Sequence, residues 1–260
     1  FTKIKIMKVL RTPDHRFKNL KDFPFEPNYT NIKDKSGVEL RIHHLDEGPK
    51  DGPIVLLMHG QPVWSYLYRK MIPYLTKAGV RIIAPDLVGY GRSDKPSSIE
   101  DYTYQTQVDW MNTWIRQNDF KKLTFFGQDW GGLIGLRVIA DNGDRFSGAV
   151  ISNTGVPLSR NMDPETHRKI KEFKASKYVP TTSEFVRAFK KPGPMAFAYW
   201  QKWSLNKKNF PAGLLVAPMF EKRTRMQMKI SGLFYEIGLE GISPLVSDLE
   251  KAYNAPFPNR

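Results

Sequence analysis

The sequence predicts an α/β fold in which a mostly parallel central sheet has helices on both faces and carries an inserted helical cap. Three observations support this fold class. Short apolar runs alternate with segments whose apolar residues recur at helical spacing. One run leads into Gly127–Gly132, whose glycines suit a tight turn from strand to helix. The alternation stops at Asn153, and only helices and loops are predicted after it.

The strands of the core are predicted from continuous apolar runs, as expected where both faces of a strand are covered. These buried strands are Ile54–Met58, Val80–Ala84, Leu123–Phe126 and Gly148–Ser152. Helices are predicted between them at Ser65–Leu75, Gln105–Gln117 and Leu133–Ala140. The carboxyl ends of such strands form the usual ligand-binding edge, which places His59–Gln61, Asp129 and Asn153 together.

The N-terminal part of the chain is predicted to be an irregular arm over residues 1–29, followed by an edge hairpin. Polar and apolar residues alternate over Asn31–Lys33 and Val38–His44, with turn-forming residues between them. His43 and His44 are adjacent and therefore point to opposite faces of their strand. We expect both to be surface residues rather than a metal-binding pair.

The domain organisation follows from where the alternation ends. We expect residues 1–155 to form the N-terminal part of the core, residues 156–250 a helical cap, and residues 251–260 the start of the return to the core. The predicted cap helices are Pro164–Phe173, Thr182–Phe189, Pro194–Trp203, Met226–Tyr235 and Ile242–Tyr253. The aromatic segment Phe197–Trp203 is a candidate lid, and packing between helices is its alternative use.

Composition limits the class of protein. The 260 residues include no cysteine, which excludes disulfides and thiolate metal sites. The net charge is +14, and 16 basic against 5 acidic residues lie between Val156 and Ile230. Because no nucleic-acid motif accompanies this charge, a solvated helical surface is favoured over specific nucleic-acid binding. No apolar run approaches the ~20 residues of a membrane span, so we expect a soluble, cytoplasmic protein with no membrane partner.

The segment Gly127–Gly132 carries the chemistry. A glycine two residues before and after an acid, between a strand and a helix, is typical of a nucleophile elbow with Asp129 as the nucleophile. The first N–H groups of the following helix and its dipole favour an ionised carboxylate there. The alternative is an ordinary strand-turn-helix in which Asp129 is the N-cap.

Three motifs in this order resemble the haloalkane dehalogenases of the α/β-hydrolase superfamily: His59–Arg69, Asp86–Pro96 and Gly127–Gly132. The resemblance extends from about Leu10 to Pro258. It implies an α/β-hydrolase fold with Asp129 as nucleophile. It also implies that Trp130 and Trp200 bind the halide, as in the subfamily whose cap supplies a tryptophan, and that the backbone N–H groups of Gln61 and Trp130 form the oxyanion hole.

The same resemblance implies the reaction. Asp129 would displace halide from a small halogenated alkane, giving an alkyl-enzyme ester that water hydrolyses to a primary alcohol. The expected ligands are the haloalkane and the halide ion. Neither a metal nor any other cofactor is needed, and a monomer is expected.

The family pattern continues beyond the cap with two more core strands, an acid and a histidine near the C-terminus. The five histidines of this chain are His15, His43, His44, His59 and His167, and none lies in a matching context. The resemblance therefore predicts a C-terminally truncated chain that lacks the last core strands and the catalytic histidine. Without that histidine, the chain is expected to lack catalytic turnover.

Two other functions stay open at this point. An epoxide hydrolase shares the fold and the aspartate nucleophile but needs tyrosine O–H donors, for which Tyr178, Tyr199 and Tyr235 are candidates. A non-catalytic binding protein on the same scaffold is the second alternative. The missing histidine favours it, whereas the intact elbow and the two tryptophans do not.

Overall fold

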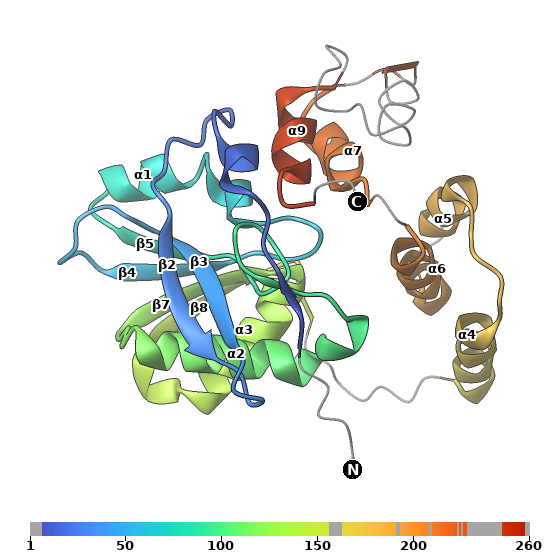
Figure 1. Ribbon diagram of the computed structural model, residues 1–260, viewed down its shortest axis with the longest axis horizontal. Helices are drawn as coiled ribbons and strands as arrows, with labels where there is room; N and C mark the ends of the chain where they lie inside the picture. Colours follow the sequence, from blue (N-terminus) through green and yellow to red (C-terminus); the bar gives the residue numbers. More distant parts are fainter. Residues whose placement is uncertain are drawn as a thin grey trace. The chain divides into compact units, whose positions relative to one another are not determined.

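A computed structural model describes residues 7–155, 163–190, 193–207, 210–222, 224, 226–227 and 246–257 of the chain (Figure 1). The chain divides into two compact units. The first unit comprises Phe1–Val156 and Pro211–Pro258, and the second comprises Pro157–Phe210 with Asn259–Arg260. Among the described residues, no helix combines the length and the apolar character needed to cross a bilayer.

The first unit is built on a six-stranded sheet with the strand order β2-β3-β5-β4-β7-β8. The pairs from β5 to β8 in this order are parallel, whereas the β2–β3 and β3–β5 pairs are antiparallel. The sheet is therefore mostly parallel, as predicted. Its strands are β2 Asn28–Lys33, β3 Glu39–Glu47, β4 Ile54–Met58, β5 Arg81–Pro85, β7 Leu123–Gln128 and β8 Phe146–Ser152. Two short strands, β1 Val9–Leu10 and β6 Lys95–Pro96, pair with each other.

Helices cover both faces of the sheet. Leu56 and Met58 of β4 pack in one hydrophobic cluster with residues of α2 and α3, whereas Leu57 packs in a second cluster with residues of α1, α7 and α9. Figure 1 shows α2 and α3 side by side on one face of the sheet, with α1 on the other. These helices are α1 Ile72–Lys77, α2 Tyr104–Gln117, α3 Asp129–Asp141, α7 Ala212–Val216 and α9 Asp248–Asn254. Short 3-10 helices lie at η1 Asp14–Phe17, η2 Ser65–Tyr68, η3 Ile99–Asp101, η4 Gly143–Arg145 and η5 Ala217–Met219.

Two predicted elements differ from the structure. The helix expected over Ser65–Leu75 is divided into η2 and α1, because Pro73 is tolerated only in the first turn of an α-helix, which therefore begins at Ile72. β8 was expected to be buried, but Val150 and Ile151 are 51% and 47% exposed. β8 is the last strand of the described sheet, so only one of its edges is paired.

The prediction that His43 and His44 are surface residues is wrong. His43 is fully buried and His44 is 6% exposed. They point to opposite faces of β3, as expected, but both faces are covered at this position. The ring of His44 lies against Trp114 and Phe120, with centroid distances of 5.4 and 6.4 Å.

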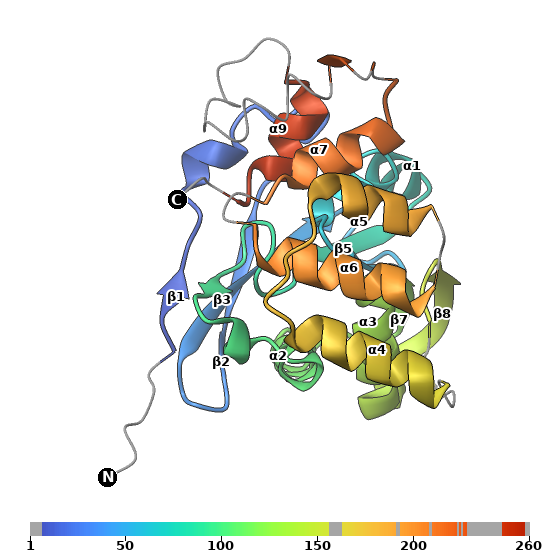
Figure 2. The same cartoon turned by 90° about the vertical axis from the view of Figure 1, so that its right-hand side faces the viewer.

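The second unit consists, in its described residues, of three helices (Figure 2). They are α4 Pro164–Ala175, α5 Thr182–Phe189 and α6 Pro194–Leu205, which confirms the three helices predicted in this region. α5 begins with a capping box in which Thr181 and Glu184 exchange hydrogen bonds. Phe185 of α5 stacks on Trp203 of α6, with ring centroids 4.6 Å apart.

The long segment of the second unit runs from Pro157 to Phe210, whereas the cap was expected to extend to residue 250. α7 and α9 belong to the first unit and pack on each other through Gly213, whose N–H donates to Asn254 Oδ1 at 2.8 Å. A side chain at Gly213 would overlap the backbone of Glu250, so this close approach requires glycine. Most of the helix predicted at Met226–Tyr235 lies outside the described residues, and that predicted at Ile242–Tyr253 is represented by α9.

Candidate active site

Asp129 lies where β7 ends and α3 begins, as the elbow motif predicts. Its φ is +52°, a left-handed conformation that costs a non-glycine residue on the order of 1–3 kcal/mol. Two hydrogen bonds hold this backbone in place. The Asp129 N–H donates to Asn153 O at 3.0 Å, and the Thr154 hydroxyl donates to Asp129 O at 2.7 Å.

The glycines around Asp129 are required by close contacts. A Cβ atom at Gly131 would overlap the carbonyl oxygens of Met58 and His59, and one at Gly60 would overlap the Asp129 side chain. A Cβ atom at Gly127 would overlap the Phe125 ring. The predicted need for side-chain-free residues two positions before and after Asp129 is therefore confirmed.

One oxygen of the Asp129 carboxylate accepts a hydrogen bond from the backbone. The backbone N–H of Gln61, in the loop that follows β4, donates to Asp129 Oδ1 at 2.8 Å. Trp130 is the second residue of α3, in the turn whose N–H groups have no acceptor within the helix. The structure thus brings Gln61, Asp129 and Trp130 together at the carboxyl ends of β4 and β7.

His59, which lies just before Gln61, is committed to the backbone through both ring nitrogens. Nδ1 lies 2.8 Å from Gly60 O and Nε2 accepts the Leu87 N–H at 3.0 Å, which assigns the proton to Nδ1. Burial lowers the pKa of His59. Neither ring nitrogen is therefore available to take a proton from water beside Asp129.

Sequence reasoning missed a buried pair close to this site. His43 Nδ1 lies 2.7 Å from Asp86 Oδ2, and both side chains are fully buried. Asp86 was noticed only as the first residue of the motif Asp86–Pro96, and His43 was expected on the surface. The two residues are 43 positions apart, so no local pattern could have joined them.

The second unit contains Trp200, the other predicted halide ligand. Its ring lies within an aromatic cluster, with centroids 5.5 to 6.5 Å from those of Phe185, Phe189, Trp203 and Phe210. The indole N–H of Trp203 donates to Thr182 Oγ1 at 3.2 Å. The indole N–H groups of Trp200 and Trp130, by contrast, donate to no residue that the structure describes.

The described tyrosines that were candidates for an epoxide hydrolase, Tyr178 and Tyr199, make local contacts within the second unit. The Tyr178 hydroxyl is hydrogen-bonded to Glu184, which raises the pKa of Tyr178 to about 12. Tyr199 stacks on Phe173, with ring centroids 4.6 Å apart. Tyr235 lies outside the described residues. Of the two described tyrosines, neither is marked out by its contacts as a proton donor.

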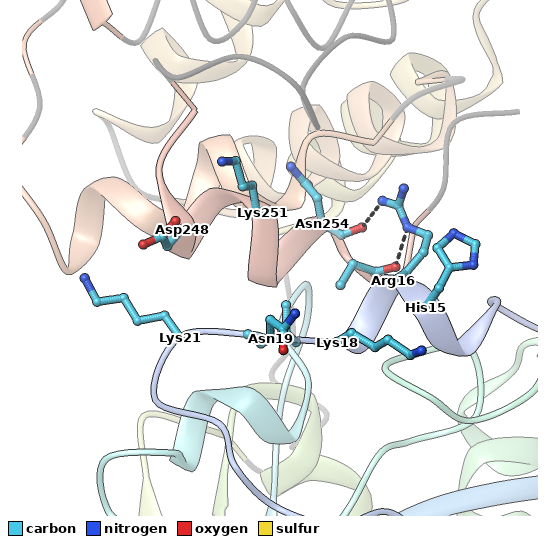
Figure 3. Close-up of a pocket in the computed structure, with 10 residues that line it drawn as sticks. His15, Arg16, Lys18, Asn19, Lys21, Asp248, Lys251 and Asn254 are labelled. Carbon is cyan, nitrogen blue, oxygen red and sulfur yellow. Dashed lines mark hydrogen bonds between the residues drawn. The ribbon is translucent and has the colours of Figure 1, made fainter.

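A separate cavity of about 370 Å³ lies in the first unit where the N-terminal arm meets α9 (Figure 3). The Arg16 guanidinium donates to the carbonyl oxygens of Asn254 and Ala255 and so joins the two segments. Figure 3 shows Lys18 and Lys21 extending in opposite directions along the arm, and the cationic groups do not converge on one point. In the described parts of the chain, no cluster of side chains could hold a metal ion.

The chain is similar to known proteins in sequence and in fold. The family model of the alpha/beta hydrolase fold matches residues 53–196. A haloalkane dehalogenase of Psychrobacter cryohalolentis is 56% identical over 167 residues, which are 64% of this chain and 55% of that protein. One of Mycolicibacterium paratuberculosis is 52% identical over 61% of this chain and 52% of that protein. The chain thus spans about half the length of the curated relatives it matches.

Among solved structures, the tetrameric haloalkane dehalogenase DpaA of Paraglaciecola agarilytica NO2 is 31% identical, with a TM-score of 0.59. The match covers 91% of this chain and 80% of that one. With the elbow, the parallel sheet and the three motifs, this similarity identifies the chain as a member of the haloalkane dehalogenase family, which has the α/β-hydrolase fold.

Proposed function

We propose that this chain carries the nucleophile of a haloalkane dehalogenase. A carboxylate oxygen of Asp129 attacks the halogen-bearing carbon, a C–O bond forms, and the C–halogen bond breaks with its electron pair leaving on the halide. The observation that carries this proposal is the Gln61 N–H bond to Asp129 Oδ1. It fixes the orientation of the carboxylate and leaves Oδ2 for attack.

Trp130 and Trp200 are the proposed donors to the departing halide. An indole N–H can only donate, so it suits an anion and has no acceptor of its own to repel one. Donors fixed in advance stabilise charge as it develops, which lowers the barrier more than it favours the bound substrate. The indole N–H of Trp203 already donates to Thr182, whereas that of Trp200 donates to no described residue. This difference supports Trp200 as the halide donor from α6.

The second step is attack of water on the ester carbonyl, with the N–H groups of Gln61 and Trp130 as the oxyanion donors. It needs a base. Of the three buried histidines, His43 is bonded to Asp86, His59 is bonded to backbone groups, and the ring of His44 packs against Trp114 and Phe120. General-base catalysis is worth roughly 10²–10⁴-fold. We therefore expect the 260-residue chain to form the ester faster than it hydrolyses it. No cofactor enters either step.

The test is bromide release from 1-bromobutane by the 260-residue chain and by its Asp129→Asn variant. The parent should release about one equivalent rapidly, whereas Asp129→Asn, which keeps the shape of the side chain, should release none above the uncatalysed rate. Equal release by both proteins would refute the assignment of Asp129. We expect the chain to be a monomer, and sedimentation velocity would distinguish it from a tetramer like DpaA.

A further inference from the structure

The loop that carries the Gln61 N–H is held at both ends by two consecutive residues. At its start, the His59 ring accepts the N–H of Leu87 at 3.0 Å. At its end, the Ser65 N–H donates to Asp86 Oδ1 at 2.8 Å. The segment 60–64, here named the 60–64 loop, lies between these bonds, and Gln61 lies within it. Asp86 and Leu87 therefore fix where the Gln61 N–H points.

Asp86 can fix the end of the 60–64 loop because its carboxylate is fully buried and accepts several hydrogen bonds. Besides the Ser65 N–H, it accepts the Arg92 N–H at Oδ2 (2.9 Å), and Oδ2 lies 2.7 Å from His43 Nδ1. Burial alone would raise the pKa of Asp86, but His43, His59 and the Ser65 N–H hold that pKa below its ordinary value. An ionised carboxylate is the stronger acceptor, and it is stable inside a protein only when paired.

His43 is placed to stabilise Asp86. Its backbone N–H donates to Ser93 Oγ at 2.9 Å, and the Ser93 hydroxyl donates to Asp86 O at 2.7 Å. The Asp86 N–H in turn donates to His43 O at 2.9 Å. The ring nitrogen Nε2 is buried and has no hydrogen-bond partner among the described residues. The hydrogen bond of the His43 ring is thus directed at Asp86.

We propose that His43 and Asp86 are positioning residues for the Gln61 N–H. They touch no reacting atom; they act through Ser65 and the 60–64 loop, so that the Gln61 N–H stays within hydrogen-bond distance of Asp129. The catalytic consequence rests on the proposed function, whereas the effect on the loop does not depend on it.

The first test compares His43→Leu with two matched variants. His43→Leu removes the donor to Asp86. His43→Asn keeps an N–H group close to the place of Nδ1. His44→Leu makes the same change one residue along β3, on the face that packs against Trp114.

The readout is hydrogen exchange of single backbone amides, followed by NMR. Exchange of the Gln61 amide should become at least tenfold faster in His43→Leu. It should remain near the parent rate in His43→Asn and His44→Leu. The Asp129 amide, which donates to Asn153 O, is the internal reference and should change much less. An unchanged Gln61 rate, or an equal acceleration of both amides, would overturn the proposal.

A second pair of variants covers the case in which His43→Leu does not fold. Ser65 is the first residue of η2 and follows an extended Trp64, so proline is compatible with the backbone there. Ser65→Pro removes the N–H that donates to Asp86. Ser65→Ala removes only the hydroxyl, which is buried without a partner. Gln61 exchange should be faster in Ser65→Pro and unchanged in Ser65→Ala. Equal rates in the two variants would refute the role of this bond.

The kinetic arm measures ester formation on Asp129 with 1-bromobutane. His43→Leu should lower the rate constant of ester formation about tenfold and leave the substrate concentration at half-saturation unchanged. Both quantities should stay close to the parent values in His43→Asn. A rise in half-saturation with an unchanged rate constant would contradict a positioning role. If the parent itself forms no ester, the proposed function fails, and the exchange rates still decide the positioning role.

Discussion

The elbow of the first unit and α6 of the second unit hold their proposed site residues in different ways. Asp129 is fixed by hydrogen bonds to Gln61, Asn153 and Thr154, and by glycines that leave no room for other residues. Trp200 is fixed by contacts between rings. Directional hydrogen bonds restrict Asp129 to one orientation, whereas contacts between aromatic rings are compatible with several orientations of Trp200. We therefore expect substitutions at the elbow to affect folding and chemistry together, and substitutions near Trp200 to separate them.

The largest effect is expected from the two tryptophans of α6. Trp200→Phe keeps the apolar bulk and deletes an N–H that has no partner among the described residues, so the barrier to ester formation should rise by about 3 kcal/mol with little change in stability. Trp203→Phe deletes the bond to Thr182, which is exposed and can bind water instead, and should lower the stability of the second unit by roughly 0.5–1.5 kcal/mol. Its effect on the barrier should be small.

Single-turnover kinetics and thermal melting of both tryptophan variants provide the measurement. Normal ester formation in Trp200→Phe would assign this residue to packing. A large kinetic defect in a fully stable Trp203→Phe variant would make Trp203 the donor instead.

The two units should also differ in their response to acid. Burial lowers the pKa of His44 to about 4, with the adjacent His43 as a smaller cause. The unfolded chain binds this proton below pH 6.5, so stability is complete above that pH and falls until about pH 4. The loss amounts to roughly 3 kcal/mol, from about 1.4 kcal/mol for each pKa unit. The described residues of the second unit contain no buried histidine, because His167, its one histidine, is exposed.

Urea unfolding followed between pH 7 and pH 4 would measure this difference. The first unit should lose stability over this range, and His44→Phe should make its pH profile flatter. The prediction would be wrong if the second unit lost more stability than the first, or if His44→Phe left the slope unchanged.

Matched substitutions of two glycines, one in the elbow and one just before α6, allow the tolerance of the two regions to an added Cβ atom to be compared. Gly131→Ala places a Cβ atom against Met58 O and His59 O, and overpacking of this kind costs about 1–3 kcal/mol. Gly193→Ala, just before α6, meets no atom within 4 Å and should change stability by less than about 0.5 kcal/mol. Denaturant midpoints would show the contrast. Equal losses in both variants would mean that the elbow is less constrained than these contacts imply.

The smallest expected effect concerns the basic residues between Val156 and Ile230. They should give weak, sequence-independent binding to DNA at low salt through counterion release. Fluorescence anisotropy should detect no binding above about 0.2 M salt. Affinity that persists there and depends on base sequence would instead indicate a nucleic-acid site.

The parts of this molecule that sequence predicts are those set by local constraints. The elbow follows from glycines within five residues of one another, and the core strands follow from continuous apolar runs, although β8 among them is half exposed. The starts of α4 and α5 follow from the capping residues Asp163 and Thr181, and α6 begins with Pro194, at a position where proline is favoured.

The parts that sequence did not predict depend on contacts between distant segments. His43 was expected at the surface because its partner Asp86 lies 43 positions away and no local pattern joins them. The packing of α7 and α9 in the first unit depends on the approach of Gly213 to the Glu250 backbone. Trp200 and Trp203 look alike in sequence, but in the structure Trp203 is fully buried and bonded to Thr182, whereas Trp200 is only half-buried.

The central claim is that Asp129 is alkylated by a haloalkane. The most direct measurement is the intact mass of the folded 260-residue chain after incubation with 1-bromobutane, followed by peptide mapping. The predicted result is one butyl group per chain, attached to Asp129 and absent from Asp129→Asn. A butyl group on another residue, or no adduct on a chain shown to be folded, would contradict the claim.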